Sequence, residues 1–201
     1  MAKILIFGDS QAGTPGAAAE SKLRSAGHQV QRISNSGKGP YDYTRFPSLW
    51  EQYTGAARSF QPDIIVAMFG SNDEPNENLA TAVARIKQAV RPKVLLTGPP
   101  QYPAAAAQQR GAAIREIYAR STGGDFLDAY PFTDPSLPRT PDGLHLPAAS
   151  AAPWGQAVAD EVERRLNAGP LSSGPSDRMD RGGPGNGSSR TRGNRRPPRK
   201  A

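Results

Sequence analysis

The sequence predicts an α/β fold, a three-layer α/β/α sandwich around a parallel, flavodoxin-like sheet of five strands. Short apolar runs alternate with stretches compatible with helices over the first 168 residues. Several of these runs are almost continuously hydrophobic, which is typical of parallel strands that are covered on both faces. The repeated strand–helix alternation favours right-handed crossovers, and these place helices on both sides of one sheet.

Five apolar segments are the predicted strands, at residues 3–7 (KILIF), 29–33 (QVQRI), 63–69 (DIIVAMF), 93–97 (KVLLT) and 125–128 (DFLD). The predicted helices cover residues 15–26, 48–59, 76–90, 103–121 and 147–167. Three prolines lie where the first turn of a helix accepts this residue: Pro15, Pro103 and Pro147.

The loops after the strands are the expected position of a functional site. In parallel α/β sheets, ligands bind beyond the carboxyl ends of the strands. Here these loops cover residues 8–14, 34–47, 70–75, 98–102 and 129–146, and all but the fourth carry a cluster of polar residues. The sequence therefore predicts an active site at this edge of the sheet.

The charge of the chain is concentrated in its last residues. The net charge is +7, but residues 1–168 are nearly neutral, with 17 Lys and Arg against 16 Asp and Glu. Residues 169–201 carry 8 basic and 2 acidic residues and are rich in Gly, Pro and Ser. This composition predicts a disordered tail after a single domain of residues 1–168. The tail is interpreted either as a flexible, solubilising extension or as a weak polyanion-binding segment that uses Arg190, Arg192, Arg195, Arg196 and Arg199.

Composition also limits the location and the cofactors. The chain has no cysteine, which excludes disulfides and thiolate metal sites. The N-terminus lacks the pattern of a secretory signal peptide, and no apolar stretch approaches the roughly 20 residues of a membrane helix. We expect a cytoplasmic or virion-associated protein that needs no metal and no other cofactor.

The segment GDSQAGTPG, residues 8–16, follows the first predicted strand and suggests either a phosphate loop or a serine nucleophile. A phosphate loop needs Lys and Ser or Thr after its second glycine, but Thr14 and Pro15 follow Gly13. Asp9 would also repel a phosphate. A serine between a strand and a helix suits nucleophilic catalysis, although a lone serine there is also a common helix cap.

A serine nucleophile needs a base, and the chain has two histidines. For His28 we expect a surface or turn role. His145 follows Asp142 by three residues, and in a turn this spacing brings the carboxylate within reach of the imidazole Nδ1–H. The other ring nitrogen then faces the serine. Asn72 and Gly37 are candidate donors to an oxyanion, although both residues are also common in ordinary turns.

Taken together, these motifs resemble those of the SGNH hydrolases, the GDSL-type esterase/lipase family, over roughly residues 3–166. The first block matches Gly8-Asp9-Ser10 with Gln11 in place of the usual Leu, the third matches Gly70-Ser71-Asn72-Asp73, and the last matches Asp142-Gly143-Leu144-His145. The glycine of the second block is Gly37 or Gly39. The resemblance implies a nucleophile at Ser10, a base at His145 oriented by Asp142, and an oxyanion hole formed by the Ser10 N–H, the Gly37 N–H and the Asn72 amide.

The expected reaction is two-step hydrolysis of an ester through an acyl-enzyme on Ser10. The predicted rim of the site is polar and aromatic: Tyr41, Asp42, Tyr43, Arg45, Glu74, Gln101 and Tyr102. Tyr41, Tyr43 and Tyr102 are the expected substrate contacts, which favours a short acyl group such as O-acetyl on a carbohydrate. A lipid or thioester substrate is an alternative. A further alternative is a glycan-binding or structural module of a particle such as a phage virion.

Overall fold

The computed structural model describes residues 1–168. The predicted tail, with the five arginines named as possible polyanion contacts, lies outside the described residues. The sheet has five parallel strands in the order β2-β1-β3-β4-β5, which confirms the predicted class and strand order. The strands are β1 (Lys3–Gly8), β2 (Gln29–Ser34), β3 (Ile64–Met68), β4 (Lys93–Thr97) and β5 (Phe126–Leu127). Each begins and ends within one residue of its prediction.

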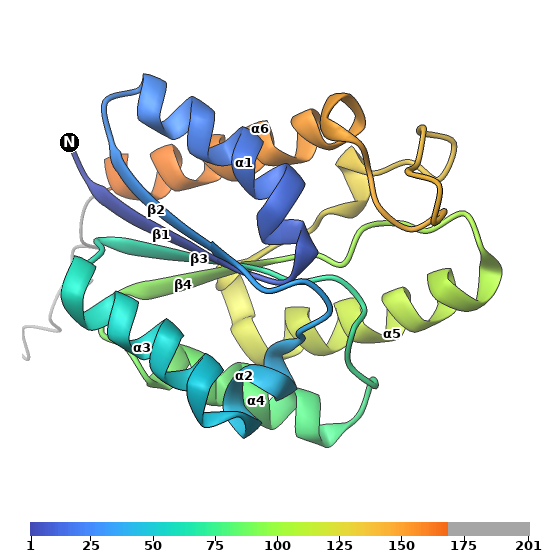
Figure 1. Ribbon diagram of the computed structural model, residues 1–201, viewed down its shortest axis with the longest axis horizontal. Helices are drawn as coiled ribbons and strands as arrows, with labels where there is room; N and C mark the ends of the chain where they lie inside the picture. The colour runs from blue at the N-terminus through green and yellow to red at the C-terminus, as the bar shows by residue number, and fades with distance from the viewer. Residues whose placement is uncertain (169–201) are drawn as a thin grey trace, which may run out of the picture. The chain divides into compact units, whose positions relative to one another are not determined.

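Helices cover both faces of the sheet (Figure 1). One layer holds α1 (Ser10–Ser25) and α6 (Ala148–Asn167), which pack against each other. The other layer holds α2 (Pro40–Arg45), α3 (Pro47–Phe60), α4 (Glu77–Gln88) and α5 (Ala105–Thr122). Short 3₁₀ turns at Gly123–Asp125 and Tyr130–Phe132 flank β5.

The central strands are almost continuously apolar after their first residues, because each of their faces is buried under a helical layer. Along β1, Ile4 and Ile6 belong to the core beneath α1 and α6, whereas Leu5 and Phe7 belong to the core on the other side. All four side chains are fully buried. The continuous hydrophobic run therefore has the cause that the sequence pattern indicates.

The prediction for the start of the first helix was wrong by five residues. Residues 10–14 were predicted as loop, but α1 begins at Ser10 because Asp9 caps it and accepts a hydrogen bond from Gln11 N at 2.8 Å. Pro15 lies inside the helix, not in its first turn. The short helix α2 was also missed, within the predicted loop 34–47. Pro103 precedes α5 by two residues, and Pro147 caps α6.

Two glycines allow backbone segments to approach closely. Gly8 ends β1 with φ of +154°, and a Cβ there would lie 1.8 Å from Met68 O of the neighbouring strand. Gly155 on α6 lies against α1, and a Cβ there would lie 2.4 Å from Pro15 O. Both contacts require glycine. The first lies at the carboxyl ends of the strands, the edge of the sheet that we call the functional edge, and the second lies where α1 and α6 pack.

His28 joins the N-terminal segment to α6 and is not a surface residue, since its side chain is 10% exposed. Its Nδ1 accepts a hydrogen bond from Ala2 N at 3.0 Å. The Nε2 atom therefore carries the ring proton and donates to Glu163 at 2.7 Å. This role is structural.

Two buried tyrosines provide a matched test of the core. The Tyr43 hydroxyl donates to Gly8 O at 3.0 Å and accepts from Asn35 at 2.8 Å. Within residues 1–168, the equally buried Tyr118 hydroxyl has no hydrogen-bond partner. We expect Tyr43→Phe to lower the free energy of unfolding by about 1–3 kcal/mol, since it leaves paired groups unsatisfied. Tyr118→Phe should leave it unchanged or raise it. Urea denaturation measures both, and an equal loss in the two variants would contradict this account.

Candidate active site

The functional edge brings Ser10 and His145 into contact across 135 residues of sequence. Ser10 is the first residue of α1, directly after β1, and its Oγ lies 2.8 Å from Nε2 of His145. His145 lies in the long loop before α6. The strand end positions the hydroxyl, and the packing of α6 on α1 positions the imidazole.

Asp142 completes a chain of three side chains. Its Oδ2 lies 2.6 Å from His145 Nδ1, while its Oδ1 accepts from Leu144 N, His145 N and the Thr140 hydroxyl at 2.8, 3.0 and 2.7 Å. The bond from His145 N, followed by those from the Thr140 hydroxyl and the imidazole, holds the pKa of Asp142 well below its usual range. An ionised carboxylate only accepts, so Nδ1 of His145 carries the proton and Nε2 is free to accept from Ser10.

Arg139 supports the loop that carries this pair, a role that sequence reasoning missed. Its guanidinium donates to Gln101 O at 2.7 Å and to Leu144 O at 3.2 Å, joining the β4–α5 loop to the residue before His145. Burial lowers the pKa of Arg139. An arginine in a polar loop gives no sequence signal for this role, because its acceptors are backbone carbonyl groups.

Asp9 is a second residue whose role was missed. It is fully buried, and its Oδ2 accepts from Gly70 N at 2.7 Å and from the Asn72 amide at 2.5 Å. Burial raises the pKa of Asp9 to about 6, against the lowering effect of its hydrogen bonds. Its position between Gly8 and Ser10 in the GDS motif was the available signal. Asp9 thus caps the helix of the candidate nucleophile and orients Asn72.

The candidate oxyanion donors lie on three loops at the functional edge. Asn72 is exposed and uses one amide hydrogen on Asp9, which leaves the other for a ligand. Gly37 is exposed with φ of +73°, whereas Gly39 is buried, and a Cβ there would lie 2.3 Å from the Asp73 carboxylate. In the described part of the chain, the N–H groups of Ser10, Gly37 and Gly39 have no acceptor.

Two of the three tyrosines predicted to contact substrate do not line the site, so that prediction was wrong for Tyr43 and Tyr102. Both are buried, at 0% and 4% exposure, and their hydroxyls pair inside the protein. The Tyr102 hydroxyl accepts from Ser71 at 3.0 Å, so the ring supports the Asn72 loop from below. Burial raises the pKa of each phenol to about 12. Tyr41 is 38% exposed and stays a candidate contact.

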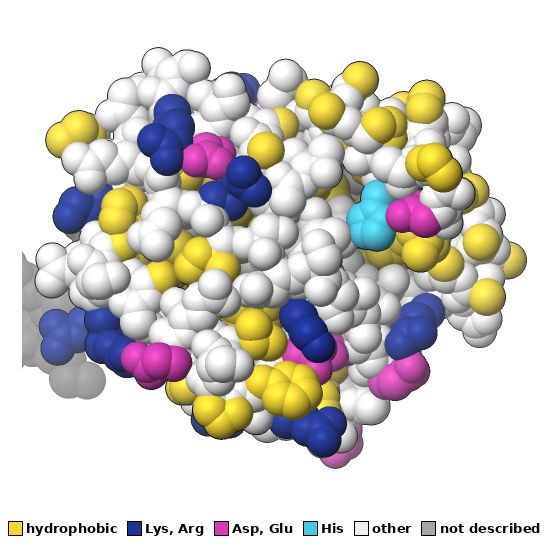
Figure 2. All heavy atoms as spheres, viewed as in Figure 1, with side chains coloured by type: hydrophobic (Ala, Val, Ile, Leu, Met, Phe, Trp, Pro, Cys, Tyr) yellow, Lys and Arg dark blue, Asp and Glu magenta, His cyan; other side chains and the backbone are white. Residues whose placement is uncertain are grey.

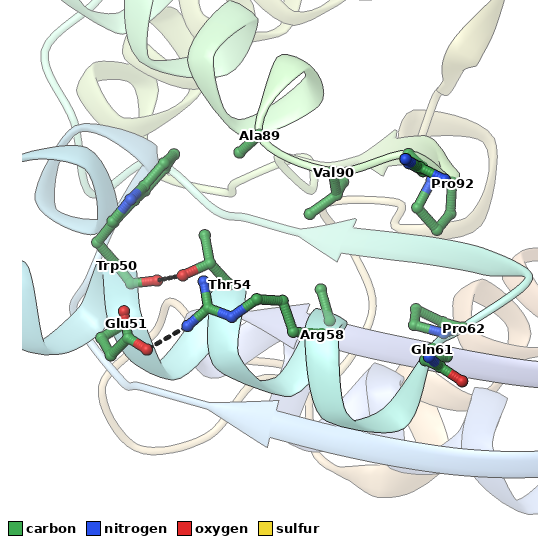
Figure 3. Close-up of a pocket in the computed structure, with 11 residues that line it drawn as sticks. Trp50, Glu51, Thr54, Arg58, Gln61, Pro62, Ala89, Val90 and Pro92 are labelled. Atoms are coloured by element: carbon green, nitrogen blue, oxygen red, sulfur yellow. Dashed lines mark hydrogen bonds and ion pairs between the residues drawn. The ribbon is translucent and has the colours of Figure 1, made fainter.

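A large cavity lies away from this edge. It measures about 690 Å³ and lies between α3 and residues 89–92, at the amino-terminal ends of β3 and β4 (Figure 3). Its lining includes Trp50, Val90 and an ion pair between Glu51 and Arg58. None of Ser10, Asp142 and His145 lines it, so its size does not mark the candidate active site.

Among residues 1–168, no group of three or more His, Asp or Glu side chains is arranged to hold a metal ion. No helix of this part of the chain is both long enough and apolar enough to cross a membrane.

No protein-family model matches the sequence, and no curated protein matches it. Solved structures are similar to it. Est24, a carbohydrate acetylesterase from Sinorhizobium meliloti, is 17% identical with a TM-score of 0.63, and the alignment covers 82% of this chain and 100% of that one. The aryl esterase of M. smegmatis is 19% identical, with a TM-score of 0.63 and coverage of 82% and 99%. A protein of Slackia heliotrinireducens that is assigned to the SGNH hydrolases is 19% identical, with a TM-score of 0.60 and coverage of 80% and 98%. The chain has the SGNH hydrolase fold.

Proposed function

We propose that this protein is a serine esterase that hydrolyses its substrate through an acyl-enzyme on Ser10. The observation that carries this proposal is the hydrogen-bonded chain from Ser10 Oγ through His145 to Asp142, with distances of 2.8 and 2.6 Å. A serine that served only as a helix cap would need no histidine at its hydroxyl and no carboxylate behind that histidine. Nucleophile, base and orienting group within hydrogen-bond reach are the arrangement of a serine hydrolase.

The geometry supports a reaction in two steps. In the first, Ser10 Oγ bonds to the ester carbonyl carbon while Nε2 of His145 takes the hydroxyl proton, and the alcohol then leaves with that proton. In the second, Nε2 takes a proton from water as the water oxygen attacks the acyl carbon. The acid is released and Ser10 regains its proton. The ionised Asp142 stabilises the imidazolium that exists during both steps.

The negative charge on the carbonyl oxygen needs donors that are already in place. We propose the N–H of Ser10 at the start of α1, the N–H of Gly37 and the free amide hydrogen of Asn72. The first lies at the positive end of the helix dipole. The third is held in position by the bond to Asp9. Gly39 is the alternative to Gly37 in this role.

The favoured substrate is a short acyl ester, O-acetyl on a carbohydrate. The exposed residues around Asn72 are mainly polar, which suits a hydroxylated alcohol better than a long alkyl chain. The likeness to Est24, a carbohydrate acetylesterase, supports the same class. A lipid or thioester substrate is the alternative that the following experiment separates.

Hydrolysis of p-nitrophenyl acetate and p-nitrophenyl octanoate by the wild-type protein tests the acyl preference. We expect a higher kcat/KM for acetate, since the cavity at Asn72 has a single aliphatic residue, Leu79, against which an octanoyl chain could be buried. Labelling with a p-nitrophenyl phosphonate, located by peptide mass spectrometry, should modify Ser10. The His145→Ala variant, which lacks the base, should react far more slowly. A preference for octanoate would indicate a lipid substrate, and failure to hydrolyse either ester would contradict the proposed function.

A further inference from the structure

A groove lies between α2 and α4 and reaches Asn72 at one end. It consists of two adjoining cavities of about 260 Å³ each, which share Tyr41 and Asn78 in their linings. The inner cavity includes Asn72, whose amide is a proposed oxyanion donor. Together the cavities reach the size of sites that hold small ligands, roughly 300–1,000 Å³. The groove is therefore large enough for the alcohol side of an ester. It meets the candidate active site at Asn72, while Ser10, Asp142 and His145 line neither cavity.

The inner cavity is rich in hydrogen-bond acceptors. Its lining has three carboxylates, three side-chain amides, one guanidinium, one phenol and a single aliphatic residue: Asp42, Asp73, Glu74, Asn72, Asn76, Asn78, Arg110, Tyr41 and Leu79. An alkyl chain would strip water from these groups without replacing its hydrogen bonds, which is costly. A sugar ring offers several hydroxyl donors over a small area. An anionic ligand would meet three carboxylates and one guanidinium, that of Arg110, which is already paired with Glu74.

Asp73 is a candidate ligand contact on this wall. Asp73 is 8% exposed, and its Oδ2 accepts a hydrogen bond from Tyr41 N at 3.1 Å. In the described residues, Oδ1 has no hydrogen-bond donor, although it is not sealed from solvent. Burial raises the pKa of Asp73 to about 6. A neutral hydroxyl donor at Oδ1 would satisfy the free oxygen at little cost.

The outer cavity differs in character. Tyr41 is 38% exposed, and the Arg45 guanidinium lies 6.0 Å from the centre of its ring. Arg85 donates to Thr44 O at 2.9 Å and so joins α4 to α2. Figure 2 shows basic and acidic side chains gathered together over α2 and α4. An exposed tyrosine next to hydroxyl and guanidinium donors suits a second sugar ring.

We propose that the α2–α4 groove binds an oligosaccharide of at least two units, with an uncharged, ester-bearing unit in the inner cavity and its neighbour beside Tyr41. This inference rests on the proposed esterase function and names the alcohol that the enzyme releases. It implies that filling the groove lowers the hydrolysis of acetylated oligosaccharides more than that of a small activated ester with the same acyl group.

The test compares two tryptophan variants on the same helix. Asn78 is exposed and lines both cavities, so Asn78→Trp fills the groove, whereas Gln88 is exposed at the other end of α4 and lines neither cavity. The substrates are partially O-acetylated xylo- and cello-oligosaccharides and p-nitrophenyl acetate. We expect the ratio of kcat/KM for oligosaccharide over p-nitrophenyl acetate to fall at least tenfold in Asn78→Trp. It should stay unchanged in Gln88→Trp. An unchanged ratio in Asn78→Trp overturns the proposal.

Failure of the esterase function is distinguished by a binding measurement. If the wild type hydrolyses no ester, titration calorimetry with the unacetylated oligosaccharides tests separately whether the groove binds them. Binding that weakens at least tenfold in Asn78→Trp and not in Gln88→Trp supports the groove. Absence of binding to the wild type overturns it.

Discussion

Replacing Ser10 by alanine is expected to lower kcat/KM for p-nitrophenyl acetate by about 10⁴–10⁶-fold. The reason is that the hydroxyl 2.8 Å from His145 is the only atom of this residue that can form the acyl-enzyme. The fold should survive, because alanine favours helix and Asp9, not Ser10, caps α1. The measurement is initial rates of wild type and variant side by side, with thermal unfolding as a check on folding.

Ser25→Ala is the matched control. Ser25 is the last residue of the same helix and is exposed, so its replacement should change neither rate nor stability. The double variant Ser10→Ala with His145→Ala should be no slower than Ser10→Ala alone, because the two residues act as one unit. Retention of the wild-type rate by Ser10→Ala would refute the nucleophile.

Asp9→Asn is expected to produce the second-largest loss, about 10²–10³-fold in kcat, comparable to removal of one oxyanion donor. Asparagine is a good helix cap and can still accept from Gln11 N. Its amide nitrogen, however, replaces the oxygen that accepts from Gly70 N and Asn72. The Gly70 N–H and the Asn72 amide then face a third donor in place of an acceptor. The Asn72 amide therefore loses its fixed orientation. Initial rates with p-nitrophenyl acetate measure this loss.

A double variant separates positioning from general damage by Asp9→Asn. If Asp9 acts through Asn72, the double variant with Asn72→Ala should be about as slow as Asn72→Ala alone. A loss that multiplies in the double variant would contradict positioning.

The dependence of stability on pH tests the burial of Asp9 itself. The pKa of Asp9 is raised to about 6 by burial, so the folded state binds this proton more tightly than the unfolded state. The contribution of Asp9 to stability is present at low pH and is lost as pH rises through about 6. Asp9→Asn should therefore flatten the fall in the free energy of unfolding over this range. Because the pKa of Asp73 is also raised to about 6, part of the fall in the free energy of unfolding with pH remains in the variant.

Most of the sheet could be predicted from the sequence, because strands buried on both faces leave runs such as Ile4–Phe7 that few other structures produce. The start of α1 could not be predicted, because Pro15 is a stronger local signal for a helix start than Asp9. The helix nevertheless begins at Ser10 and accommodates Pro15 in its second turn. Helix α2 has only six residues, too few to show a helical period.

The site shows the same division between local and long-range information. The Asp142–His145 contact depends on a spacing of three residues, and such a spacing is visible in a sequence. The burial of Tyr43 and Tyr102 depends on Gly8 and Ser71, which lie 35 and 31 residues away and supply partners for the hydroxyls. Tyrosine is amphipathic, so its residue type alone did not distinguish a loop support from a surface contact.

The helix that packs against α1 through Gly155 also sets the time at which the site forms during biosynthesis. The ribosome adds about 5–20 residues per second, and domains fold as units as they emerge. Ser10 leaves the ribosome early, whereas His145 follows 135 residues later and precedes α6, which packs on α1. A nascent chain therefore carries the proposed nucleophile for most of its synthesis before the proposed base has been made.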